Sequence, residues 1–97
     1  MAHFFHIGVN CYARAVPYDK IQPHIDQAKD WVRYSNNSWF IWTNESAEFW
    51  YRRLRPQLHP DDSIIVVEVI VTNAFGWMQQ MAVDWLTRDR TIDRPGL

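Results

Sequence analysis

The chain has 97 residues, with ten Lys and Arg against eleven Asp and Glu, and hydrophobic side chains occupy 47% of its positions. This length predicts one small domain, and the near-neutral charge excludes a polybasic protein while leaving room for a local basic patch. The longest apolar run, from Ile64 to Val71, is interrupted by Glu68 and is too short to span a bilayer, so no membrane partner is expected.

The first third of the chain predicts a strand followed by a helix. Residues 4–11 alternate as a strand does, and three apolar side chains share one face of it: Phe5, Ile7 and Val9. The helix is expected to begin between Asp19 and Gln22, because Pro23 is tolerated only in a first turn, and to end near Asp30. Its apolar positions recur at helical spacing, at Ile21, Ile25 and Ala28.

A hairpin and a second helix are expected next. Residues 31–34 and 39–43 predict two strands around the compact turn Ser35–Ser38, whose two Asn residues tolerate positive φ. Asn44 is predicted to cap the N-terminus of the second helix. The apolar stripe of this helix consists of Ala47, Trp50, Tyr51 and Leu54.

The last third predicts one more strand and one more helix. The strand is expected from Ser63 to Val71, after a break at two prolines, and the helix from Trp77 to Arg88. The stripe predicted for this helix is Trp77, Met81 and Trp85. Residues 3–88 are therefore expected to form a single domain, and residues 89–97 a flexible C-terminal tail.

The order of elements predicts an α+β protein with the ferredoxin-like βαββαβ arrangement and an extra C-terminal helix. Right-handed crossovers place both main helices on one face of a four-stranded antiparallel sheet. The opposite face is left open, and either the third helix or a second copy of the chain is expected to cover it.

Five segments carry a resemblance to a known family: residues 7–10 (IGVN), 31–34 (WVRY), 38–41 (SWFI), 43–47 (TNESA) and 62–67 (DSIIVV). Together they resemble the SinR-like proteins, small relatives of the second CRISPR-associated Cas protein, over about residues 5–88. The resemblance implies a ferredoxin-like fold and a homodimer. In the metal-dependent nucleases among those relatives, an Asp at the end of the first strand holds a divalent metal. The matching position here is Asn10, and an amide is a poor sole ligand for Mg²⁺.

A polar group is expected on the open face of the sheet. The first and fourth strands are neighbours in the usual strand order, so His6, Asn10 and Glu68 are predicted to lie close together. These residues would serve metal binding or acid–base chemistry. The alternative, which we favour because the spacing matches no known metal or triad motif, makes Glu68 an interface or sheet-edge residue paired with Arg or His.

The other polar residues do not predict a metal site or a catalytic site. The four histidines fall on different elements and Cys11 is the only cysteine, so no zinc site is expected. Cys11 is expected to be a small buried hydrophobe, and a chain without a possible internal disulfide favours the cytoplasm. Asp61 and Asp62 follow Pro60 directly and are interpreted as a solvated acidic pair in a turn. No secretory signal is expected at the N-terminus.

Two surfaces are candidates for binding nucleic acid. One is basic: Arg52, Arg53 and Arg55, with Arg14 and Lys20, would bind phosphates. We favour the alternative, a solvated helix end whose cations complement the helix dipole, because the slightly acidic total charge weakens attraction for nucleic acid. Aromatic rings on the open face would stack bases or be buried in a homodimer, which we favour; they are Phe4, Phe40 and Trp42.

The sequence thus favours a non-catalytic homodimerising scaffold or adaptor without a cofactor, whose partner is a second copy or another protein. One alternative is a metal-dependent endonuclease that uses Mg²⁺ or Mn²⁺ at Asn10, with His6 and Glu68 as helpers. The other is a weak, sequence-tolerant nucleic-acid binder.

Overall fold

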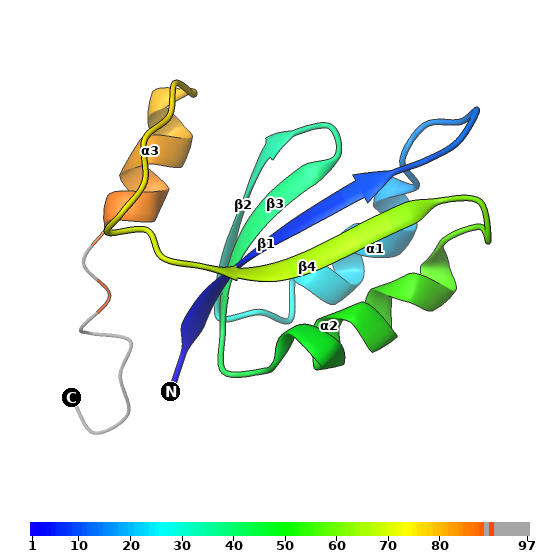
Figure 1. The fold of residues 1–97 in the computed structure, drawn as a ribbon, viewed down its shortest axis with the longest axis horizontal. Coiled ribbons are helices and arrows are strands. Elements are labelled where there is room, and N and C mark those ends of the chain that lie inside the picture. Colours follow the sequence, from blue (N-terminus) through cyan, green and yellow to red (C-terminus); the bar gives the residue numbers. More distant parts are fainter. Residues whose placement is uncertain (89, 91–97) are drawn as a thin grey trace.

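The structure is a computed structural model that describes residues 1–88 and 90. Its elements, in chain order, are β1 (His3–Asn10), α1 (Tyr18–Ile25), β2 (Asp30–Ser35), β3 (Ser38–Thr43), α2 (Ala47–Leu54), a 3₁₀ turn (Arg55–Gln57), β4 (Ser63–Val69) and α3 (Gln80–Thr87). The strands form one antiparallel sheet in the order β2-β3-β1-β4 (Figure 1). The predicted α+β class with a four-stranded antiparallel sheet is confirmed, and the arrangement is compatible with a ferredoxin-like fold.

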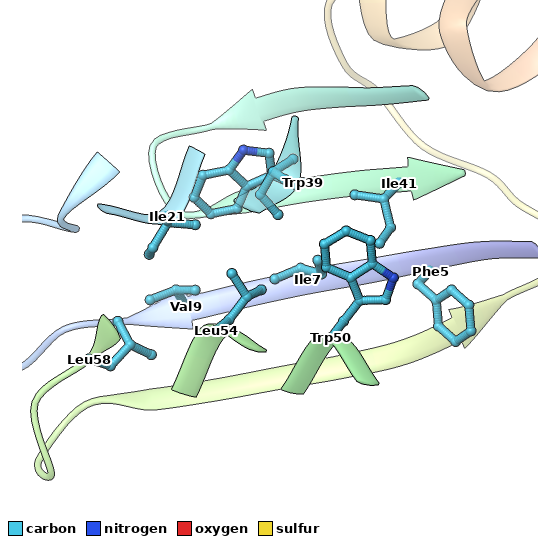
Figure 2. Close-up of a cluster of buried hydrophobic side chains, with 10 residues drawn as sticks. Phe5, Ile7, Val9, Ile21, Trp39, Ile41, Trp50, Leu54 and Leu58 are labelled. Atoms are coloured by element: carbon cyan, nitrogen blue, oxygen red, sulfur yellow. The ribbon is translucent and has the colours of Figure 1, made fainter. Parts of the chain in front are cut away.

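The main core lies between one face of the sheet and the helices α1 and α2. Figure 2 shows side chains from the sheet and from both helices meeting in one cluster. Its largest members are Trp39 of β3 and Trp50 of α2, both almost fully buried. Each indole N–H is nevertheless satisfied, because Trp39 Nε1 donates to Gln22 Oε1 at 3.1 Å and Trp50 Nε1 donates to Thr43 Oγ1 at 3.2 Å.

Both main helices have boundaries that differ from the prediction. The N-cap of α2 is Ser46, not Asn44: its backbone is extended, and its Oγ accepts a hydrogen bond from Phe49 N at 3.1 Å. The end of α1 at Ile25, rather than near Asp30, follows from hydrogen bonds that tighten the backbone after the helix. Gln27 N donates to His24 O at 3.1 Å and Ala28 N donates to Ile25 O at 2.9 Å, which turns the chain toward β2.

The helix α3 packs on the opposite face of the sheet from α1 and α2 (Figure 1). A second, smaller cluster forms there around Val32, Ala82 and Trp85. The predicted stripe is therefore wrong in part: α3 begins at Gln80, so Trp77 precedes it and is fully exposed, and Met81 also faces solvent. The buried positions follow the actual helix, in which Ala82 and Trp85 are three residues apart.

The strand β4 is also shorter than predicted. β4 ends at Val69, two residues before the predicted end. The predicted flexible tail falls mainly on residues 89 and 91–97, which lie outside the described part of the chain. Its one described residue, Arg90, is buried. No helix within the described ranges is long and apolar enough to cross a membrane.

Candidate functional site

The most prominent surface feature is the half of the sheet that α3 leaves uncovered. On the face opposite α1 and α2, the cluster around Trp85 covers the β2–β3 side. On the β1–β4 side, Gly8 lies opposite Ile65 and His6 lies opposite Val67. The side chains of Ile65 and Val67 remain 59% and 43% exposed. We call the surface formed by these four residues the open half-face.

The backbone of β4 adds to this feature. In the described chain, β4 pairs with β1 alone and therefore forms one edge of the sheet. Its outer N–H and C=O groups are available to another strand. The segment that follows β4 adds further exposed apolar side chains: Ile70, Phe75 and Trp77. Exposed apolar side chains on β4 and in the segment that follows it are typical of an interaction surface.

His6 contacts Tyr34 and Phe40 rather than Asn10. Its Nε2 lies 2.5 Å from the hydroxyl of Tyr34, and its ring meets Phe40 edge-on with the centroids 5.2 Å apart. Tyr34 in turn stacks on Phe40 at 4.9 Å. Partial burial lowers the pKa of His6, which favours the neutral imidazole. Tyr34, which reaches this histidine from β2, was not among the residues singled out by the sequence.

Glu68 is not part of this group, so the predicted cluster of His6, Asn10 and Glu68 is wrong. Glu68 lies directly opposite Phe5 in the β1–β4 pairing, which places it on the α1–α2 side of the sheet. It is exposed there, and its Oε2 lies 2.9 Å from His3 Nδ1. Glu68 thus behaves as a sheet-edge residue paired with a histidine, which was the alternative interpretation.

Asn10 lies exposed at the end of β1, opposite Ser63, between two shallow hollows. Asp62, which precedes β4, is not a solvated turn residue as expected. Its side chain is almost fully buried and accepts hydrogen bonds from Tyr12 N at 3.0 Å, from His59 N at 2.9 Å and from the Arg14 guanidinium. Asp61 beside it remains exposed.

The three donors determine the charge of Asp62. Burial opposes ionisation, but the backbone amides of His59 and Tyr12 and the Arg14 guanidinium outweigh it and lower the pKa of Asp62 to about 2. The carboxylate therefore joins the loop after β1 to the start of β4. Cys11 packs against the main core but is only partly buried, so it is less buried than expected. Burial and the Asp62 charge raise the pKa of its thiol. Within residues 1–88 and 90, no three His, Cys, Asp or Glu side chains are grouped to hold a metal ion.

The basic residues of α2 and the following turn are each engaged locally. Arg52 Nε pairs with Glu48 Oε2 at 2.7 Å, and the Arg53 guanidinium lies 5.2 Å from the centre of the Phe49 ring. Arg55 donates to the carbonyl oxygens of residues 58 and 59 at 3.4 and 3.3 Å. This arrangement matches a solvated helix end with local partners.

The aromatic candidates lie on the predicted face but under a cover from the same chain. Phe4, Phe40 and Trp42 all belong to the cluster beneath α3. Phe4 meets the ring of Trp85 at 5.7 Å, edge to face. Their faces are thus shared with α3 rather than presented as an open platform for bases.

Comparison of the chain with protein-family models, with curated proteins and with solved structures finds no match. Within the described residues, the geometry defines a small α+β protein that has an open apolar half-face and in which β2 and β4 are the edge strands of the sheet.

Proposed function

We propose that this protein is a non-catalytic, ferredoxin-like module that acts in the cytoplasm as a homodimeric scaffold or adaptor, in the manner that the SinR-like resemblance implies. The strand order β2-β3-β1-β4, with α1 and α2 on one face, supports the ferredoxin-like assignment. The observation that carries the homodimer is the open half-face, where Ile65 and Val67 stay exposed although α3 covers the rest of that sheet face.

A second copy of the chain suits this surface because the outer edge of β4 can pair with itself and the exposed Ile65 and Val67 side chains can pack against their own copies. Antiparallel pairing of two β4 edges would satisfy the outer backbone groups of each strand and place the Ile65 and Val67 side chains of both copies on one continuous face. Glu68 would stay on the other face, near His3, where its charge does not need to be buried. A stable interface buries about 1,600 Å² in total. The β4 edge and two side chains from each copy would bury less than this, so neighbouring residues of both copies would also have to be buried.

The oligomeric state at low micromolar concentration tests the proposal. Light scattering after size exclusion should give twice the 11.7 kDa chain mass for the wild type. Val67→Lys and Ile65→Lys should each give the mass of one chain, because they place a charge in the interface. Tyr51→Lys, at an exposed aromatic position on α2, is the matched control and should remain dimeric. A wild-type protein that is monomeric at these concentrations would refute the homodimer.

The geometry supports the absence of catalysis as part of the same proposal. Asn10 is neutral, Glu68 lies on the other face, and the oxygens of Asp62 are held by three donors. We therefore expect no cleavage of RNA or DNA with Mg²⁺ or Mn²⁺. Calorimetry and cleavage assays on the wild type, Asn10→Asp and Glu68→Gln test this. Metal binding and cleavage by the wild type that are both lost in Glu68→Gln would make Glu68 catalytic.

A further inference from the structure

The guanidinium of Arg90 occupies an aromatic cage on the α3 side of the sheet. Its Cζ lies 4.3 Å from the centre of the Trp85 ring, 4.9 Å from Phe4 and 5.7 Å from Trp42. All three distances fall within the range in which a cation is attracted to the face of an aromatic ring. The Arg90 side chain is only 5% exposed, and the three rings form part of its surroundings.

The walls of the cage belong to the fold and do not depend on Arg90. Phe4 of β1 and Trp42 of β3 are direct cross-strand partners, and their rings lie 4.5 Å apart with a tilt of 46°. Trp85 projects from α3, is buried, and packs with Val32 and Ala82. Because three separate elements hold the rings at different angles, the cage should persist when its occupant is removed.

The cage also has a polar end suited to a cation that can donate hydrogen bonds. Arg90 Nη2 donates to the carbonyl oxygen of Trp85 at 2.6 Å and lies 3.5 Å from Asp30 Oδ2. Asp30 also receives Arg88 Nη1 at 2.9 Å, although Arg88 itself stays exposed. Aromatic faces, a carbonyl acceptor and a carboxylate suit the guanidinium of an arginine, because its several N–H groups can donate to both acceptors.

We propose that Phe4, Trp42, Trp85 and Asp30 form a binding site for an arginine side chain of a partner polypeptide, and that Arg90 is its internal occupant. Arg90 is only three positions beyond the end of α3, so it competes with an external ligand at an effective concentration of about millimolar or more. The apparent affinity of the wild type for an external ligand therefore equals the affinity of the empty cage multiplied by the fraction of time that Arg90 is out of it. This site is separate from the open half-face and does not depend on the proposed homodimer.

The test removes the internal occupant and adds a small cation. N-acetyl-arginine amide and N-acetyl-trimethyllysine amide are titrated into Arg90→Ala while the indole N–H signals of Trp42 and Trp85 are followed by nuclear magnetic resonance. The arginine derivative should give a saturable shift of both signals, at a concentration at least tenfold lower than for the wild type. The trimethyllysine derivative, which has no N–H to donate to the carbonyl oxygen of Trp85, should bind more weakly, and a stronger response to it would contradict an arginine site.

Three controls make the result specific. N-acetyl-citrulline amide, which has nearly the shape of the arginine derivative without its charge, should not give the shift. Arg88→Ala loses a cation from the same carboxylate but keeps Arg90 in the cage, so it should behave as the wild type does. Adding Trp42→Leu to Arg90→Ala should abolish the shift.

The proposal is overturned if Arg90→Ala keeps a dispersed spectrum and the arginine derivative gives no saturable shift, or if citrulline acts as arginine does. Should Arg90→Ala lose its folded spectrum, the wild type decides. At high ligand concentration its two indole signals should respond to the arginine derivative but not to citrulline or to sodium chloride of equal ionic strength. Equal responses to all of these would refute the site.

Discussion

Replacing Thr43 by Val should destabilise the protein although the two side chains have nearly the same shape. Thr43 ends β3 and is only 2% exposed. Its Oγ1 accepts a hydrogen bond from Trp50 Nε1 at 3.2 Å and another from Glu45 N at 3.1 Å. Valine keeps the volume but accepts neither, so the change isolates the hydrogen bonds from the packing.

The two lost bonds differ in cost. Trp50 is 1% exposed, so its indole N–H has no water to bond in place of Thr43, and leaving it unpaired costs about 1–3 kcal/mol. Glu45 is exposed, so its amide can be hydrated and adds only about 0.5–1 kcal/mol. The expected total of about 1.5–4 kcal/mol is a large part of the stability of a small domain.

Urea unfolding followed by tryptophan fluorescence measures this loss, and a double-mutant cycle assigns it. In a Trp50→Phe background the indole donor is already absent, so Thr43→Val should cost only about 1 kcal/mol or less. The exposed Thr72→Val is the control and should change the free energy of unfolding by no more than about 0.5 kcal/mol. Equal costs of Thr43→Val in both backgrounds would refute the reasoning.

Three further predictions follow from single contacts. The fold lowers the pKa of Asp62 from 3.8 to about 2, so the ionised carboxylate stabilises the folded protein fully above pH 3.8. This stabilisation is lost as the pH falls toward 2. The thermal unfolding temperature of Asp62→Asn should therefore depend less on pH in this window than that of the wild type. Ser46→Ala should cost about 1 kcal/mol by urea unfolding, because Phe49 N loses its acceptor. Any nucleic-acid binding should show a log–log salt slope no steeper than about −3 and should disappear when the three clustered arginines, Arg52, Arg53 and Arg55, become Glu; binding that survives would point to the aromatic face.

The sequence predicted the α+β class because its strands and helices carry different periods. The alternation around Phe5, Ile7 and Val9 identifies the buried face of β1, and the structure buries all three. The fourth strand offers no such guide, since residues 64–67 are apolar without interruption. Its face is set by the pairing of Phe5 with Glu68, a register that depends on tertiary contacts and cannot be read from composition.

The environments of Asp62 and Arg90 were not predicted, because contacts between elements that are distant in the sequence determine both of them. Asp62 is buried because donors from the loop after β1 meet it, and its neighbours Pro60 and Asp61 indicate only a turn. Arg90 lies in a segment with no apolar periodicity, and its cage requires rings from three elements. Neither residue carries a local signal, so only the three-dimensional arrangement reveals its environment.

The central position of β1 has a consequence for how the chain folds during synthesis. β1 is the first strand to be made, yet one of its partners, β4, is the last. At about 5–20 residues per second, several seconds pass before Val69 emerges to pair with Phe4. During that interval the hairpin of β2 and β3 can form and recruit β1, but the other edge of β1 stays unpaired. The nascent chain is therefore expected to be most vulnerable to aggregation in this interval, and closing the β1–β4 pair should limit its folding rate.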